Sequence, residues 1–208
     1  MVSAGSAKCT EPVRVAVFAS GRGTNAEALI RFSHRPEACY RVVLIVSNTS
    51  RAGVRSVAER YGVPFVHISS HTHPEPADYV AALLQLLAHH RVELIALAGY
   101  LKKVPAEVVQ TYRGRIFNIH PALLPKFGGP GMYGLHVHAA VLQAGETHTG
   151  ASVHVVEEEY DTGPVLAQIR IEVLPGDTPE QLAQRLLPYE HELYPRVLNQ
   201  QARLLRRC

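Results

Sequence analysis

The sequence lacks any long apolar run and is poor in cysteine. No apolar stretch approaches the ~18 residues that a membrane-spanning helix needs, and residues 1–12 lack the apolar core of a signal peptide. The three cysteines, Cys9, Cys39 and Cys208, are odd in number and widely spaced, which supports neither a disulfide framework nor a zinc site. We therefore expect no membrane contact and a cytoplasmic location.

Net charge is also low. The formal charge is +3 over 208 residues, and the Lys and Arg residues are scattered, so the chain lacks the basic patch that nucleic-acid binding requires. Apolar residues make up 47% and charged residues 19%, which is typical of a globular protein rather than a disordered one. We expect a disordered leader over residues 1–12, a single domain over 13–201 and a basic, solvated tail over 202–208.

The first half of the chain alternates apolar strands with helical segments, without an internal repeat or a long linker. The strands are expected at 14–19, 42–46, 64–68 and 93–98, and the helices at 25–31, 54–61 and 78–90. This alternation predicts an α/β fold with a Rossmann-like, mostly parallel sheet that is covered by helices on both faces.

The second half has a different pattern. Residues 151–157 and 165–173 alternate polar and apolar side chains, as half-buried strands do, and a turn over 161–164 joins them. We expect these two strands as antiparallel additions at one end of the sheet. A helix over 178–201 follows them.

A glycine-rich turn, Ser20-Gly-Arg-Gly-Thr-Asn25, lies between the first strand and the first helix. Such a turn brings backbone N–H groups and a helix N-terminus together, which suits an anion such as phosphate. Ala26 replaces the third glycine of the dinucleotide fingerprint, and the Lys of the P-loop is absent. The turn favours a phosphate monoester over NAD or ATP, but a tight turn with a Thr or Asn cap explains it equally well.

Asn118 and His120 lie two residues apart at the end of a predicted strand, so their side chains share a face. An amide can donate to a developing oxyanion, and an imidazole can exchange a proton near neutral pH. The carboxyl end of a parallel strand is where such sheets bind ligands. We favour a catalytic pair over a polar strand end with a satisfied histidine.

Asp161 stands before Thr-Gly-Pro, in the position of a turn-forming aspartate. A catalytic role would require folding to bring it beside His120, where its charge would raise the pKa of the imidazole. His154 shares a strand face with Ser152 and could contact substrate or simply pack. The spaced pairs His71/His73 and His136/His138 lack a third ligand, so we expect no metal.

Six segments identify the chain by resemblance. They are, in order, Gly21-Arg-Gly-Thr-Asn25, Leu97-Ala-Gly-Tyr100, Phe117-Asn-Ile-His-Pro-Ala-Leu-Leu-Pro-Lys126, Gly150-Ala-Ser-Val-His154, Asp161-Thr-Gly-Pro-Val165 and Tyr189-Glu-His-Glu-Leu-Tyr-Pro195. Together they resemble the folate-dependent phosphoribosylglycinamide formyltransferases over residues 13–201. Each motif alone is modest, but six in the same order are specific.

The resemblance implies formyl transfer from the co-substrate 10-formyltetrahydrofolate to the amine of glycinamide ribonucleotide in purine biosynthesis, with no metal. It assigns catalysis to Asn118, His120 and Asp161. The residues that it assigns to binding are Gly23, Thr24 and Asn25 for the substrate phosphate, Glu190 for the ribose, and Leu101, Lys102, Lys103, Val104, Asn118, Glu157, Glu158, Glu159, Tyr160 and Asp161 for the folate. In the implied mechanism Asn118 and a protonated His120 stabilise the tetrahedral oxyanion. A homodimer is an option that the sequence leaves open.

Three departures from the family pattern stand out. Residues 73–76 lack the Arg that often contacts the folate tail, Leu187 replaces an often polar residue three positions before Glu190, and the glycine-rich stretch 127–135 is longer than in some relatives. We therefore expect a different cation, with Lys102 ahead of Lys103, to face the folate tail.

Three rival functions are weighed against this interpretation. A methionyl-tRNA formyltransferase would need a further C-terminal domain, for which the 208 residues leave no room. A formyltetrahydrofolate deformylase would need no phosphate-binding turn and typically carries an N-terminal regulatory domain. A non-catalytic nucleotide-binding module would leave Asn118, His120 and Asp161 without a role.

Overall fold

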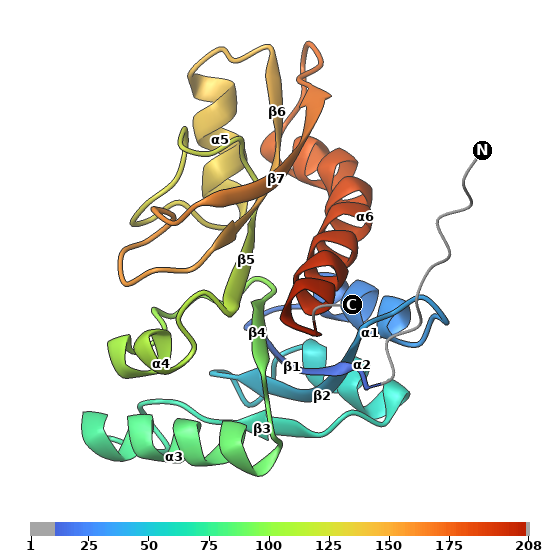
Figure 1. Ribbon diagram of the computed structural model, residues 1–208. Coiled ribbons are helices and arrows are strands. Elements are labelled where there is room, and N and C mark those ends of the chain that lie inside the picture. Colours follow the sequence, from blue (N-terminus) through green and yellow to red (C-terminus); the bar gives the residue numbers. More distant parts are fainter. Residues whose placement is uncertain (1–10, 207–208) are drawn as a thin grey trace, which may run out of the picture.

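A seven-stranded sheet forms the centre of the protein (Figure 1). The computed structural model describes residues 11–206. The strands are β1 (Val13–Phe18), β2 (Tyr40–Ser47), β3 (Phe65–His67), β4 (Leu94–Leu97), β5 (Ile116–His120), β6 (His148–Val155) and β7 (Val165–Glu172). Their order is β3-β2-β1-β4-β5-β6-β7, parallel from β3 to β5 and antiparallel for β6 and β7. The predicted mostly parallel sheet with antiparallel additions is confirmed.

Six helices connect or follow the strands. They are α1 (Thr24–Ser33), α2 (Val54–Tyr61), α3 (Pro76–His89), α4 (Ala106–Thr111), α5 (Leu135–Gln143) and α6 (Pro179–Arg206). The sequence did not predict α4, and it ended the last helix at residue 201 although α6 continues through 202–206. The rest of the predicted tail, 207–208, and residues 1–10 of the predicted leader lie outside the described residues.

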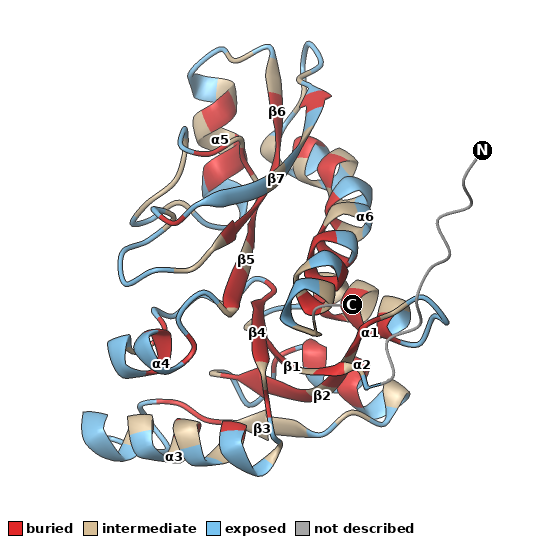
Figure 2. Cartoon of the chain, in the orientation of Figure 1, coloured by how far each residue is buried: buried red, intermediate tan, exposed pale blue. Residues whose placement is uncertain are grey.

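The two faces of the sheet carry separate apolar cores because side chains alternate along each strand. On β1, Val15 and Val17 face the core shared with α1, α2, α5 and α6, whereas Ala16 and Phe18 face the core under α3 and α4. Figure 2 shows the buried residues concentrated on the strands and on the inner sides of the helices. Helices therefore cover both faces, as predicted.

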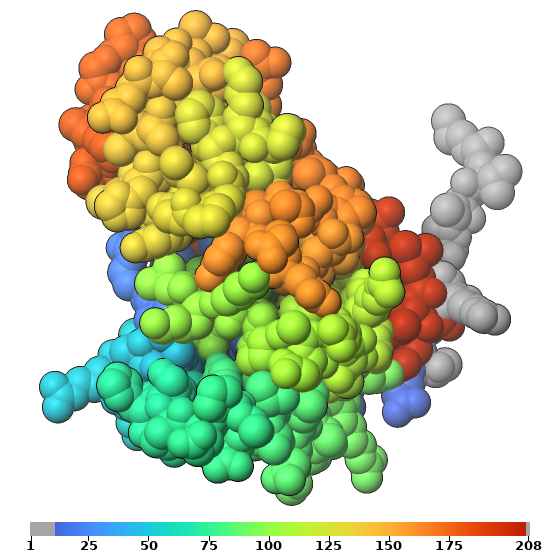
Figure 3. All heavy atoms as spheres, turned by 90° about the vertical axis from the view of Figure 1, so that its left-hand side faces the viewer, coloured from blue at the N-terminus to red at the C-terminus, as the bar shows by residue number. Residues whose placement is uncertain are grey.

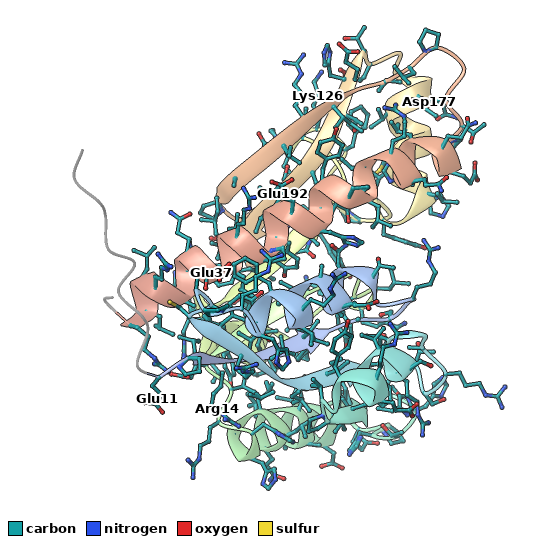
Figure 4. All side chains as sticks on the ribbon, turned by 90° about the vertical axis from the view of Figure 1, so that its right-hand side faces the viewer. Glu11, Arg14, Glu37, Lys126, Asp177 and Glu192 are labelled. Carbon is teal, nitrogen blue, oxygen red and sulfur yellow. The ribbon has the colours of Figure 1, made fainter. Side chains whose placement is uncertain are left out.

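The long helix α6 ties the two ends of the sheet together, and it crosses the molecule diagonally in Figure 4. The fully buried Tyr194 directs its hydroxyl at the carbonyls of Leu97, on β4, and Phe117, on β5, at 3.1 and 2.8 Å. Further along the same half of the helix, the Asn199 side chain accepts a hydrogen bond from the Cys39 backbone N–H at 2.6 Å. These contacts fix the ends of β4 and β5 relative to α6.

Two expectations from composition can be compared with the structure. Cys39 is disulfide-bonded, which the cysteine spacing gave no reason to expect. Between residues 11 and 206, no helix combines the length and the apolar character needed to cross a membrane.

Candidate active site

A large cavity opens at the carboxyl ends of β1, β4 and β5, where parallel sheets bind ligands. Its volume is about 1020 Å³. The lining comes from many parts of the chain: Gly21, Arg22 and Asn25 after β1, Leu97 and residues 99–104 at and after the end of β4, residues 118–121 at the end of β5, the loops 129–135 and 156–161, His138 on α5, His154 on β6, and the face of α6 that carries Glu180, Ala183, Gln184, Leu187 and Glu190. In Figure 3 the orange segment that follows β6 lies against the green segment around α4. The cavity therefore has walls from both halves of the chain.

Asn118 and His120 both lie in this cavity, as their shared strand face predicts. The antiparallel pairing of β5 with β6 places Asn118 opposite His154 and His120 opposite Ser152. After β6 the chain turns back, and Asp161, in a left-handed conformation with φ of 57°, brings its Oδ2 to 3.6 Å from His120 Nδ1. Asp161 is thus brought beside His120, the condition that separated a catalytic role from a simple turn.

Hydrogen bonding fixes the tautomer of His120. Its Nε2 lies 2.8 Å from the backbone oxygen of Phe127, and because a carbonyl only accepts, Nε2 carries a hydrogen. In the neutral ring the free lone pair is therefore on Nδ1, the nitrogen that faces Asp161. A proton can enter or leave His120 at Nδ1 without breaking the bond to Phe127.

The charge state of His120 differs from the expected one. Burial of the ring, which is only 3% exposed, lowers its pKa, while Asp161 and the Phe127 carbonyl raise it. Burial prevails, so the net pKa lies below 6.5 and the neutral form predominates near pH 7. The mechanism implied by the resemblance uses a protonated His120, whereas burial favours the neutral ring in the ligand-free protein, an effect that the sequence alone does not show.

His154 contacts both Asn118 and Asp161, which together with His120 form the predicted catalytic trio. Its Nδ1 donates to the Val155 carbonyl at 2.9 Å, and its Nε2 lies 3.0 Å from Asn118 Nδ2 and 3.3 Å from Asp161 Oδ1. Because Nδ1 carries the hydrogen, Nε2 can accept from the Asn118 amide. His154 is 2% exposed and lines the cavity, so its buried ring can hold the Asn118 and Asp161 side chains in position.

Asp161 remains a carboxylate despite its surroundings. Burial raises its pKa, but the adjacent His154 ring, the proximity of His120 and the backbone N–H of Gly129, which donates at 2.9 Å, together lower the pKa by more. The net pKa is below the usual value for aspartate. A negative charge is thus maintained 3.6 Å from His120.

The glycine-rich turn forms the amino end of α1. The residue that precedes the helix is Gly23, with φ of 82°, and no side chain caps the helix, so the alternative of a Thr or Asn cap is wrong. Gly21 and Arg22 line the cavity, but Gly23 does not: a Cβ on Gly23 would lie 2.6 Å from the Val54 side chain. Thr24 lines a separate groove between α1 and α6.

Asn25 and Glu190 meet across the cavity wall. The Asn25 amide donates to Glu190 Oε2 at 2.6 Å, and Asn25 Oδ1 has no hydrogen-bond partner among the described residues. Glu190 is 8% exposed, and this burial raises its pKa, although the Asn25 bond lowers it in part. Both residues line the cavity, so the Glu190 carboxyl group is the polar group that this pair presents to a ligand.

The residues predicted to bind folate lie on two loops that line the cavity. All of residues 101–104 and 157–161 line the cavity. Lys103 contacts Glu159 at 3.3 Å and lies 5.7 Å from the ring centre of Tyr160, while Gln110 donates to Glu158 at 3.2 Å. The two loops therefore close on each other at the mouth.

Sequence reasoning missed part of the lining. The additional residues are Arg22, Tyr100, residues 129–135, His138, Glu180 and Gln184. Arg22 stood in a recognised motif, but the α6 residues come from a helix whose exposed face carries no signal of its own. Within residues 11–206, no group of three or more His, Cys, Asp and Glu could hold a metal ion.

Comparison with known proteins agrees with this geometry. The formyl transferase family model matches residues 13–198. The chain belongs to the formyl transferase family. A formyl transferase from Arabidopsis thaliana, named phosphoribosylglycinamide formyltransferase, chloroplastic, is 43% identical over 89% of this chain, which spans 64% of that relative's length.

Two bacterial formyl transferases match over nearly their whole length. The phosphoribosylglycinamide formyltransferase of Bacillus subtilis (strain 168) is 38% identical, over 90% of this chain and 93% of its own. The crystal structure of phosphoribosylglycinamide formyltransferase from Brucella melitensis superposes with a TM-score of 0.85 and 40% identity, over 92% of this chain and 96% of that one. The formyltransferase fold is thereby confirmed.

Proposed function

We propose that this formyl transferase moves the formyl group of 10-formyltetrahydrofolate to the amine of glycinamide ribonucleotide, in purine biosynthesis. The observation that carries the proposal is the contact of Asp161 with His120, next to Asn118, in the cavity. The rest of the lining falls into two unlike groups of residues, which we call the two arms of the cavity. One arm has the amino end of α1 and the buried Glu190. The other is formed by the loops that carry Lys102, Lys103 and Tyr160. The names of the similar proteins support the same reaction.

The ribonucleotide fits the arm at α1. Uncapped N–H groups at a helix N-terminus attract phosphate, and α1 has no side-chain cap. The ribose hydroxyls of the ribonucleotide would meet Glu190, which Asn25 holds by its hydrogen bond. The amine then extends along the wall toward Asn118 and His120.

The folate fits the opposite arm. Residues 101–104 and 156–160 offer both apolar contacts and cations there, and the formyl group reaches the trio. The amine nitrogen attacks the formyl carbon, and the resulting oxyanion takes a hydrogen bond from the Asn118 amide, whose second N–H is not needed by His154. The formyl C–N bond of the folate then breaks.

Proton transfer completes the reaction. The attacking nitrogen loses one proton as it becomes an amide, and the departing folate nitrogen gains one, so no net proton is consumed. Nδ1 of neutral His120 can take that proton, because Asp161 stabilises the imidazolium that forms. The same proton then passes to the leaving nitrogen.

A coupled assay tests the proposal. Purified protein with 10-formyltetrahydrofolate and glycinamide ribonucleotide should release tetrahydrofolate, and omission of the ribonucleotide should abolish this release. Inorganic phosphate should compete with the ribonucleotide and not with the folate. Equal turnover without the ribonucleotide would instead identify a deformylase, and no turnover with both substrates would contradict formyl transfer.

A further inference from the structure

His138 is a buried histidine of the cavity wall that the proposed chemistry does not use. It lies on the first turn of α5 and is only 4% exposed, yet it lines the cavity. Its Nδ1 is buried and has no hydrogen-bond partner among residues 11–206. The other buried histidines of the site, His120 and His154, are hydrogen-bonded.

An unpartnered buried imidazole nitrogen is unfavourable for folding. Burying a polar group without a hydrogen bond destabilises the folded state, and leucine would fill a similar volume without that cost. Burial, together with the nearby His120, lowers the pKa of His138 to about 4, so the ring is neutral near pH 7. A neutral imidazole offers one N–H donor and one acceptor to a ligand, rather than a charge.

The position of His138 narrows the choice of ligand. His120 is close enough to influence its titration, and α5 packs against α6, the helix that carries Glu190. His138 is therefore near the catalytic histidine, on a helix that packs against the one carrying Glu190, whereas the folate loops 101–104 and 156–160 are other segments of the lining. This placement favours the part of the ribonucleotide nearest the formyl group as its ligand.

We propose that His138 hydrogen-bonds the glycinamide part of the ribonucleotide and so holds its amine beside His120. The inference rests on the proposed function, because it assigns a residue to the amine substrate of that reaction. The neutral ring suits this role, since its lone pair can accept a hydrogen from the amine or amide nitrogen. The substrate would reach the ring at Nε2, because Nδ1 itself is buried.

The test combines affinity with stability. In His138→Leu, the Kd of the ribonucleotide should rise by about tenfold, as expected for the loss of one buried hydrogen bond, while the Kd of the folate stays unchanged. The Tm should be equal to or higher than that of the wild type, because an unpartnered polar group is removed. His138→Gln keeps a donor and an acceptor and should recover part of the affinity.

His136 provides the matched control. It is exposed on the same helix, its ring contacts that of Tyr133, and it is not among the residues that line the cavity. His136→Leu should leave both Kd values unchanged. Unchanged ribonucleotide affinity in His138→Leu would overturn the inference, and so would a lowered Tm with equal losses for both substrates, which would indicate a structural role.

The wild-type protein separates this failure from that of the proposed function. If the wild type binds the ribonucleotide and transfers formyl while His138→Leu binds it equally well, only the inference fails. If the wild type binds no ribonucleotide, the proposed function fails and the inference fails with it.

Discussion

At the scale of single residues, the site depends on opposing effects on His120. Burial disfavours the imidazolium, and the Asp161 carboxylate favours it. The result is a ring that is neutral at rest and can still accept a proton at Nδ1, because the charge 3.6 Å away compensates for part of the lost hydration. This balance suits a group that must take up a proton and then release it.

Replacing Asp161 by Asn tests the role of that charge. Asn tolerates the left-handed conformation and can still accept from the Gly129 N–H, so the turn should survive. Without the carboxylate the imidazolium loses its stabilisation, and kcat should fall by about a hundredfold or more. Steady-state kinetics at saturating substrates, with circular dichroism as a folding control, provide the measurement. A kcat near that of the wild type would reduce Asp161 to a turn residue.

We expect Lys102 and Lys103, at the cavity mouth, to contribute differently to folate binding. Lys103 is already paired with Glu159 and stacked over Tyr160, whereas no described carboxylate lies within salt-bridge distance of Lys102. An exposed Lys–carboxylate contact contributes only about 0–1 kcal/mol and is screened by salt. We expect Lys102→Ala to raise the folate KM a few-fold at low salt, with kcat unchanged, and Lys103→Ala to do less. If neither change alters that KM, another group holds the folate tail.

At the scale of secondary-structure elements, the pattern predicted most helices and strands but not the short or irregular ones. α4 has only six residues, too few to show helical periodicity. α6 continues past residue 201, and it does so because Arg206 binds Glu93 through two bonds of 2.7 Å, a long-range contact that no local signal reveals. The sequence predicted the turn before α1 as a candidate anion site. It could not predict that Gly21 lines the cavity whereas Gly23 packs against Val54.

Gly21 and Gly23 should therefore respond differently to substitution. Gly23 has φ of 82° and Val54 blocks the position of its Cβ, so Gly23→Ala should lower stability by about 1–3 kcal/mol. A Cβ on Gly21 would meet nothing within 4 Å, and Gly21 lines the cavity. Gly21→Val should leave the Tm unchanged and raise the ribonucleotide KM by hindering backbone approach to phosphate. Thermal melts and kinetics of both variants check this, and an unaltered KM in Gly21→Val would argue against phosphate at this turn.

At the scale of the whole molecule, the sequence predicted which residues carry chemistry better than it predicted how they meet. Asn118 and His120 were readable because they share one strand. The contact of Asp161 with His120 depends on the register of β5 with β6 and on the turn that follows, which no local pattern fixes. His138 and the lining at 129–135 come from separate packing elements, and the net pKa of His120 depends on burial by the complete fold.

Buried histidines also predict how the whole protein responds to acid. Burial lowers the pKa values of His90, His120, His138 and His191. Between each folded-state pKa and about 6.5, the unfolded chain binds more protons than the native one, so the free energy of unfolding rises with pH and is lost as pH falls. The carboxylates with lowered pKa values, such as Asp161, act in a lower window, near and below pH 4.

His138 should contribute most clearly to that acid sensitivity, because its pKa falls from 6.5 to about 4. Protonation of the unfolded state alone should cost on the order of 2 kcal/mol of stability between pH 7 and pH 5. In His138→Leu this contribution disappears, so the free energy of unfolding should decrease less over the same interval. Urea unfolding at both pH values measures the difference, with the exposed His136→Leu as the control that should retain the wild-type slope. An equal slope in His138→Leu and wild type would mean that His138 is not held neutral by burial, and the substrate hydrogen bond assigned to its neutral ring would lose its basis.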